Sequence, residues 1–143
     1  MKYRLIIEPE REEEVIVYAH KRSELTDRIE AIVLSENEEL IGYTEHGVVR
    51  LDPVEIYAFI VEDSKVYVLT DSDKMLVKLR LYQLEDRFSH EFLKINQSCL
   101  VNVKMIRRFD SSIGGSLMVE LKNGYRDYVS RRQLKTVKER IGF

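Results

Sequence analysis

The sequence predicts a mainly β protein made of small antiparallel sheets with short helices, preceded by a small α+β segment at the N-terminus. Three features of the sequence lead to this fold class. Apolar and polar residues alternate over short stretches, which is the period of a half-buried strand. Turn residues separate these stretches at intervals too short for parallel crossovers, so the strands are expected to be antiparallel. Apolar residues recur at helical spacing in only three places.

The N-terminal segment is expected to span residues 1–47 and to be α+β. The stretch "KYRLII" alternates and stops at Pro9, and "EVIVYAH" follows an acidic run, so both are expected strands. The stretch "SELTDRIEAIVLS" has its apolar residues at near-helical spacing and is the expected helix. A shift in charge and the pair Asp52-Pro53 place the boundary near residue 47. This segment is the candidate surface for a dimer or for another partner.

The second domain is expected to span residues 48–143. Strands are predicted at "EIYAFIVE", "KVYVLT", "KMLVKL", "SLMVEL" and "YRDYVS", and a helix at "LYQLEDRF". Asn123-Gly124 joins the last two strands and predicts a hairpin with a type I′ turn. The chain closes on "QLKTVKERIGF", whose apolar face predicts the third helix and whose Gly142 marks its end.

The start of this last helix carries two arginines. Ser130 to Gln133 matches a capping box, which places Arg131 and Arg132 at the first two helical positions. Arginines there add their charge to free N–H groups that already suit an anion. The alternative is a pair of exposed arginines that solvent tolerates.

Composition describes an ordinary globular protein. The chain has 143 residues, of which 44% are hydrophobic and 34% charged. No apolar run reaches the length of a membrane span, and "MKYRLIIEPE" lacks the plan of a signal peptide. The single cysteine, Cys99, cannot form an intrachain disulfide, which fits a reducing compartment. These features predict a cytoplasmic protein.

The net charge of −2 hides a strong asymmetry along the chain. Residues 1–45 carry 6 Lys/Arg against 12 Asp/Glu, a net of −6, and residues 46–143 carry 17 against 13, a net of +4. Within the latter, residues 92–143 carry 11 against 4, a net of +7. Such an asymmetry favours a polyanionic partner for the basic part, although a basic surface without a partner has the same signature.

The stretch "FLKINQSCLVNVKMI" interrupts an apolar pattern with a polar run. If the apolar parts are two strands, Asn96, Gln97 and Ser98 form the tight link between them and lie on the surface. Asn and Gln side chains donate to and accept from an adenine edge at the same time, which makes Asn96 and Gln97 candidate base-reading residues. Asn102 is expected to have a structural role, capping the following turn.

The same stretch, followed by a Gly-containing loop and "ELKNGYRDYVSRRQLKTVKERI", resembles the LytTR family of bacterial DNA-binding domains. The matching features are Phe92, the "S-x-L-V-N" of Ser98 to Asn102, Ile106 and the closing "VSRRQL". The resemblance covers roughly residues 48–142. It implies an elongated stack of small antiparallel sheets that presents loops to successive major grooves. It therefore implies a sequence-specific transcriptional regulator of duplex DNA, with homodimerisation expected and with no cofactor.

The resemblance also implies which residues meet the DNA. The family's reading loops fall on Lys65, on Asn96 and Gln97, and on Arg131 and Arg132. The second loop departs from many relatives, which carry a His-Arg pair there, because Asn96-Gln97 keeps hydrogen bonding without charge. The full set of candidate DNA-binding residues is Lys65, Lys94, Asn96, Gln97, Arg107, Arg108, Arg131, Arg132 and Lys135.

Some 45 residues precede the expected domain, too few for a receiver domain of typical size. Small LytTR regulators with such a short leader resemble a subgroup often encoded beside a membrane protein. A membrane protein is therefore an expected candidate for the regulating partner.

Two other function classes have weaker support in the sequence. For an enzyme, His20, His46 and His90 are isolated and no nucleophile or metal motif accompanies them, so no catalytic or metal site is expected. For a cyclic-dinucleotide receptor of the PilZ type, "DSSIGG" supplies the D-x-S-x-x-G half of the signature. The other half, R-x-x-x-R, is absent from the sequence, which favours DNA binding.

Overall fold

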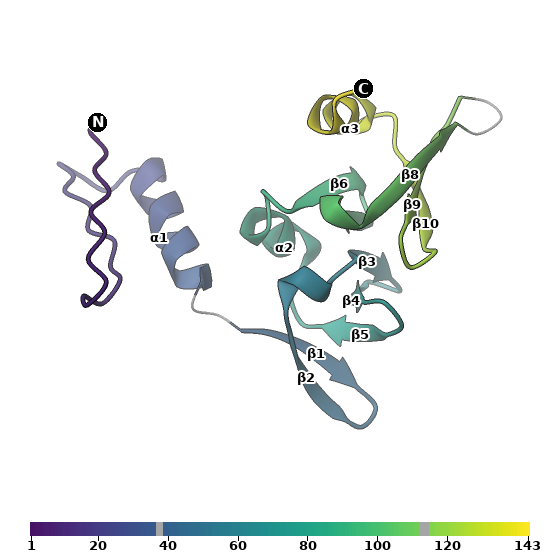
Figure 1. Ribbon diagram of the computed structural model, residues 1–143, viewed down its shortest axis with the longest axis horizontal. Helices are drawn as coiled ribbons and strands as arrows, with labels where there is room; N and C mark the ends of the chain where they lie inside the picture. Colours follow the sequence, from purple (N-terminus) through teal and green to yellow (C-terminus); the bar gives the residue numbers. More distant parts are fainter. Residues whose placement is uncertain (37–38, 112–114) are drawn as a thin grey trace. The chain divides into compact units, whose positions relative to one another are not determined.

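The computed structural model describes residues 1–36, 39–111 and 115–143 (Figure 1). The chain divides into two units, residues 1–38 and residues 39–143. No helix in the described ranges is long and apolar enough to cross a membrane.

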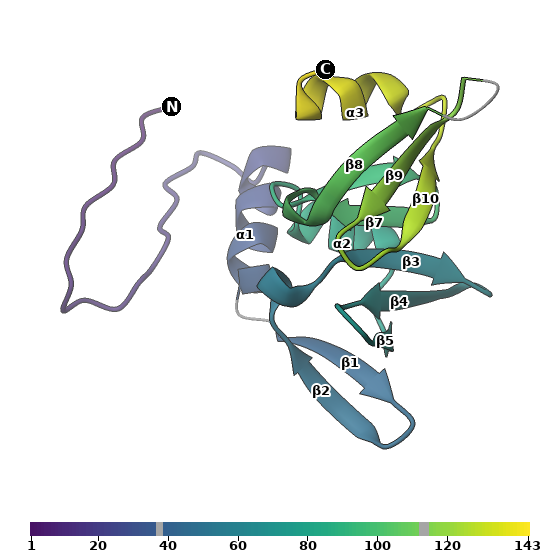
Figure 2. The ribbon, with the colours of Figure 1, turned by 45° about the vertical axis from the view of Figure 1, so that its right-hand side comes forward.

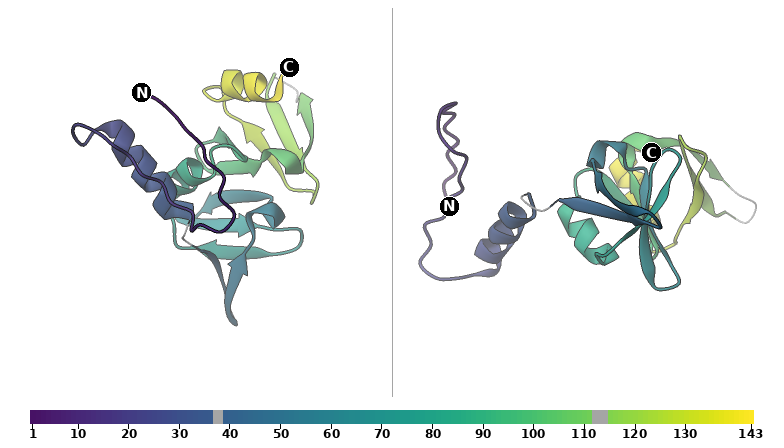
Figure 3. Two further views of the ribbon diagram at one scale, coloured as in Figure 1. Left: turned by 60° about the vertical axis from the view of Figure 1, so that its left-hand side comes forward. Right: turned by 90° about the horizontal axis from the view of Figure 1, so that it is seen from below.

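The N-terminal unit contains the expected helix, α1 (Glu24–Glu36). Ser23 and Thr26 cap it reciprocally, because each side-chain oxygen accepts from the other residue's backbone N–H, at 2.8 and 3.3 Å. The two strands expected in "KYRLII" and "EVIVYAH" are wrong for this structure, in which residues 1–23 hold no strand (Figure 3). A strand needs a hydrogen-bonded neighbour, and in this described part of the chain no backbone hydrogen bond joins the two stretches.

The second unit is built on a seven-stranded antiparallel sheet. Its order is β2-β1-β5-β4-β3-β7-β6, so neighbours in space are mostly neighbours in sequence. The sequence analysis missed β1 and β2. The strands are β1 (Leu40–Thr44), β2 (Gly47–Leu51), β3 (Ala58–Glu62), β4 (Lys65–Leu69), β5 (Lys74–Val77), β6 (Phe92–Asn96) and β7 (Cys99–Asn102).

A three-stranded antiparallel sheet, in the order β10-β9-β8, completes the unit together with two α-helices. Figure 2 shows these three strands side by side, with α3 above their upper end. The sequence analysis missed β8. The remaining elements are η1 (Pro53–Glu55), α2 (Leu81–Arg87), η2 (Val103–Met105), β8 (Ile106–Ser111), β9 (Leu117–Leu121), β10 (Arg126–Val129) and α3 (Leu134–Ile141).

Both faces of the large sheet are buried at its central strands, β3 and β7. Along β3 the side chains alternate, so Phe59 enters one apolar cluster while Ala58 and Ile60 enter the other. The first cluster lies under α2, where Phe59 packs against Phe88 and Phe92 with ring centroids 5.1–5.9 Å apart. The second cluster includes residues of the small sheet and of α3. Double burial explains why the central strands read as continuous apolar runs.

Two turns differ from expectation. The expected type I′ turn at Asn123-Gly124 is wrong, since only Gly124 has a positive φ, at 90°. Its N–H donates to the Leu121 carbonyl at 2.9 Å, which makes a longer loop. The I′ signature lies instead between β3 and β4, where Asp63 and Ser64 have φ values of 50° and 64°.

The boundary between the units lies before the expected one at residue 47, because β1 pairs with β5 and buries Leu40. We expect fragment 39–143 to fold alone with a cooperative thermal transition. A fragment starting at Asp52 would lose β1, β2 and Leu40, so its melting temperature should be lower by at least about 10 °C. Thermal denaturation of both fragments followed by circular dichroism tests this, and equal melting temperatures would contradict the assigned boundary.

Candidate nucleic-acid interface

The three expected reading loops meet at one end of the large sheet. The Val61 N–H donates to the Ser98 carbonyl at 2.9 Å, which places the β3–β4 turn beside the β6–β7 turn. The Ser130 N–H donates to the Ile95 carbonyl at 2.8 Å, which places the chain after β10 beside β6. The turns therefore form a row along β4, β3, β7, β6 and the end of β10. At about 4.8 Å per strand, this row is roughly 20 Å long.

Asn96 holds two of these turns together. Its side chain is 2% exposed, and its Nδ2 donates to Asp127 Oδ1 at 3.1 Å and to the Tyr128 carbonyl at 2.9 Å. Its Oδ1 accepts from the Ser98 N–H at 2.8 Å. Both ends of the amide are thus used inside the protein. Asn96 is expected from the sequence to read a base, but its buried amide is already hydrogen-bonded within the protein and braces the two loops.

Asp127 is a residue beside the candidate interface that could not be singled out from the sequence alone. Its carboxylate accepts from Asn96, from the Tyr128 N–H at 2.8 Å and from the Tyr125 hydroxyl at 2.8 Å. A partial sequence signal existed, because Tyr125, directly before β10, and Asp127 and the buried Val129 within it alternate and so share one face. A carboxylate on the inward face of a strand indicates a polar network rather than a solvent contact.

Cys99 lies against this network and is fully buried. Burial raises the pKa of its thiol well above the usual value, and the Asp127 carboxylate raises it further. Burial likewise raises the pKa of the Tyr125 phenol, with Cys99 and Asp127 adding to the shift. Both groups therefore stay neutral in the folded protein at pH values where they ionise in an unfolded chain.

We expect alkaline pH to destabilise the fold through these two groups. Above their ordinary pKa values of about 8.5 and 10, the unfolded chain binds fewer protons than the folded protein, so the free energy of unfolding falls as pH rises. Urea denaturation at a series of pH values from about 7 to 10.5 measures this slope. In Tyr125→Phe the slope should be shallower, and a slope identical to wild type would contradict the assignment.

Four expected DNA-binding residues lie on the row with exposed side chains: Lys65, Gln97, Arg131 and Arg132. Lys65 opens β4 directly after the Asp63-Ser64 turn, and Gln97 occupies the β6–β7 turn. Within residues 39–111 and 115–143, neither Lys65 nor the two arginines form an ion pair. Their charges are available to an external anion.

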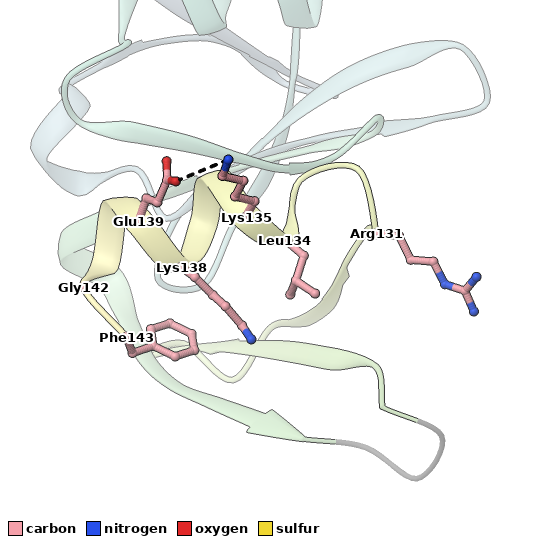
Figure 4. Close-up of a pocket in the computed structure, with 7 residues that line it drawn as sticks. All are labelled: Arg131, Leu134, Lys135, Lys138, Glu139, Gly142 and Phe143. Carbon is pink, nitrogen blue, oxygen red and sulfur yellow. Dashed lines mark ion pairs between the residues drawn. The ribbon is translucent and has the colours of Figure 1, made fainter.

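Arg131 and Arg132 lie on a turn rather than in the helix. The capping box expected at Ser130 is wrong, because α3 begins at Leu134 and Gln133 is its N-cap without a side-chain bond. The Gln133 N–H instead donates to the Ser130 carbonyl at 3.0 Å, which closes a tight turn through the arginines. Figure 4 shows Arg131 pointing away from α3 and from the other labelled side chains.

Beside Arg131 lies an open hollow of about 600 Å³. Its floor is apolar, with Leu134 and Phe143, and Lys138 lies across it (Figure 4). Lys135 is exposed on the same helix and lies 4.0 Å from the Glu139 carboxylate. This part of α3 extends the positive surface past the turn.

The structure does not bring Arg107 and Arg108 to this row. Both lie near the start of β8, where Arg108 faces Glu120, while the row ends beside the other end of the small sheet. Arg108 forms ion pairs with Asp110 at 3.1 Å and Glu120 at 2.6 Å.

Lys94 is half-buried within β6. Asn102 has the structural role expected for it, since it accepts from the Lys104 N–H at 3.1 Å and donates to the Ile56 carbonyl at 2.8 Å.

Comparison with known proteins identifies the family and the fold. The family model of the LytTr DNA-binding domain matches residues 46–142. The chain belongs to the LytTR family. A solved LytTr DNA-binding domain from Bacillus cereus aligns with a TM-score of 0.69 at 20% identity, covering 75% of this chain and 100% of that one. This LytTR fold confirms the expected mainly β class of antiparallel sheets with short helices.

Relatives of this LytTR protein match it over almost its whole length. Proteins named "Uncharacterized HTH-type transcriptional regulator" from Staphylococcus aureus strains MSSA476 and NCTC 8325 are each 30% identical over 147 residues. The alignments cover 99% of this chain and 98% of each relative, so they include the N-terminal unit. Strands separate α1 from α2 and α2 from α3, so the described residues contain no helix-turn-helix.

Proposed function

We propose that this LytTR protein is a transcriptional regulator that binds specific duplex DNA through the row of turns, without catalysis. The observation that carries the proposal is the convergence of Lys65, Gln97, Arg131 and Arg132 at one end of the sheet. The LytTr DNA-binding family match and the regulator names of the relatives support it. The N-terminal unit and the expected membrane-protein partner then belong to the regulation of this activity.

The charged and the uncharged side chains of the row have different expected contacts with DNA. Lys65 and the arginines neutralise phosphates or grip guanine edges, whereas uncharged Gln97 reads an adenine edge. A row of roughly 20 Å follows about six base pairs at 3.4 Å per pair. A protomer that contacts so few base pairs has limited sequence specificity. A homodimer that binds two half-sites has a higher specificity.

Selection of bound sequences from a random duplex library would identify the operator. On that operator we expect binding to weaken steeply as salt rises, with about four phosphate contacts per protomer and a log–log slope of about −3 to −4 per protomer. Fluorescence anisotropy between about 50 and 300 mM salt measures the slope. A slope near zero, or a selection without enriched sequence, would overturn the proposal.

The cyclic-dinucleotide alternative has less support. In its D-x-S-x-x-G pattern, Asp110 is already paired with Arg108 and Arg126, at 3.1 and 3.3 Å. Ser112 lies outside the described residues. Titration with labelled cyclic dinucleotides would separate the two functions, and we expect no saturable binding.

A further inference from the structure

Two apolar stretches of the N-terminal unit, residues 3–7 and 15–18, expose most of their side chains to solvent. Figure 2 draws residues 1–7 and the stretch before α1 as open traces, joined by a turn in which the Arg11 N–H donates to the Glu8 carbonyl at 3.1 Å. In the first stretch Tyr3, Leu5 and Ile7 are 87%, 69% and 81% exposed. Alternation along an extended chain places these three side chains on one face.

This unit cannot bury them by itself. Chains below about 40 residues usually need a disulfide, a metal or another subunit to form a core. Within the unit, Val15 and Val17 lie across from α1, yet a hollow of about 310 Å³ remains between them and Ile29. The unit therefore has both an unpaired extended backbone and unfilled apolar space, which indicates a missing strand-forming partner.

The charges at the two ends of the first stretch are arranged symmetrically about Leu5. Lys2 lies at one end and Glu8 at the other, and Pro9 stops pairing directly after Glu8. Two copies placed antiparallel about a two-fold axis at Leu5 bring Lys2 of each copy opposite Glu8 of the other. The same register pairs Tyr3 with Ile7, so the apolar face of one copy continues into that of the other. When this stretch pairs antiparallel with an identical stretch, the opposite charges at its ends face each other, and Tyr3, Leu5 and Ile7 face apolar residues. A second copy of the chain is therefore a fitting partner.

We propose that residues 2–8 of two copies pair as antiparallel strands centred on Leu5, and that this pairing makes the regulator a dimer. The inference rests on the homodimer proposed above and specifies the surface that forms it. The small ribbon has Tyr3, Leu5 and Ile7 of both copies on one face, which supply apolar cover for the hollows beside the two α1 helices. Lys2, Arg4, Ile6 and Glu8 remain on the other face, toward solvent.

Disulfide trapping tests the register without DNA. In Leu5→Cys the two introduced thiols face each other across the axis, where Cα atoms are about 4.5–5.5 Å apart and a disulfide can form. In the matched control Ile6→Cys, the Cα atoms of the two introduced cysteines lie more than about 7 Å apart, which is too far for a disulfide. Native Cys99 is fully buried and does not compete. After mild oxidation we expect a covalent dimer of full-length Leu5→Cys on a non-reducing gel and a monomer band for Ile6→Cys. Trapping that is equal for both, or stronger for Ile6→Cys, would overturn the register.

A charge swap tests the ion pairs. Lys2→Glu and Glu8→Lys should each weaken dimerisation, by about 2- to 25-fold for the two symmetric pairs, and the double variant should recover it. Glu8 also pairs with Arg11 at 3.3 Å, so Glu14→Lys, which removes the other Arg11 pair at 2.8 Å, is the matched control and should dimerise normally.

Sedimentation equilibrium or light scattering of the full chain reads out these dimerisation constants. A wild-type monomer at all accessible concentrations, or a double variant no better than the single ones, would overturn the inference. Because no DNA is present, that failure is distinct from a failure of operator binding.

Discussion

Asn96→Ala is expected to lower the free energy of unfolding by about 2–4 kcal/mol. The substitution leaves the Ser98 N–H and the Tyr128 carbonyl without this partner in a partly buried site, while Asp127 Oδ1 keeps the Tyr128 N–H. Each buried group left unpaired costs about 1–3 kcal/mol, and relaxation recovers part of this. Urea denaturation measures the loss. Operator affinity should fall as well, because the β6–β7 turn and the arginine turn lose their common brace.

Two matched variants distinguish the effect of Asn96 on operator binding from its effect on folding stability. Asn102→Ala removes an equally buried amide far from the row, so it should cost similar stability while operator binding by the folded fraction persists. Gln97→Ala removes an exposed side chain and should change stability by no more than about 0.5 kcal/mol. If Asn96→Ala were as stable as wild type and weakened DNA binding alone, Asn96 would be a base-reading residue after all.

Combined replacement of Arg131 and Arg132 by Ala should cause the largest loss of DNA affinity. Removing two phosphate contacts flattens the log–log salt slope by about 2, and affinity should fall by one to two orders of magnitude, about 1.4–2.8 kcal/mol, at moderate salt. Gln97→Ala should instead cost about 1–3 kcal/mol on the operator, with an unchanged slope, since it releases no counterions. Anisotropy titrations on operator and random duplexes distinguish the two effects.

Arg107→Ala is the matched control for the double replacement. Arg107 is an exposed arginine of the same domain, but it lies on β8 away from the row. Its replacement should leave the salt slope unchanged. An equal flattening from Arg107 would show that the DNA crosses the small sheet, and equal losses for Gln97→Ala on both duplexes would show that the β6–β7 turn reads no base.

The strands that could be predicted from the sequence are those with alternating apolar residues between recognisable turns. Period-two patterns and turn residues located β3 to β7, β9 and β10, and the spacing of Leu81, Leu84 and Phe88 located α2. The hairpin of β1 and β2 escaped because β2 is an edge strand with exposed valines, so its pattern carries little burial signal. The expected strands in residues 1–23 have strand-like composition, but a strand also needs a partner, which local sequence does not encode.

For the candidate interface, exposure was easier to predict than burial. Gln97 is exposed on a turn, as its place in the polar link indicated, whereas Arg131 and Arg132 are exposed on a turn and not at the expected start of the helix. Asn96 has the same polarity as Gln97 but points inward, because it meets Asp127 from a strand 31 residues away in sequence. Arg108 reads as a free cation in the sequence, and only the fold brings Glu120 and Asp110 to it. These pairings are tertiary, so no window of neighbouring residues contains them.

The hydrogen bonds of Asn96 also affect how related regulators can acquire different DNA-sequence preferences. The buried amide and its partners keep the backbone of both turns in place whatever side chains their tips carry. Gln97, Arg131 and Arg132 can therefore be exchanged at little cost in folding. On the interface proposed above, gene copies that share this frame can diverge in operator preference through substitutions at these tips alone.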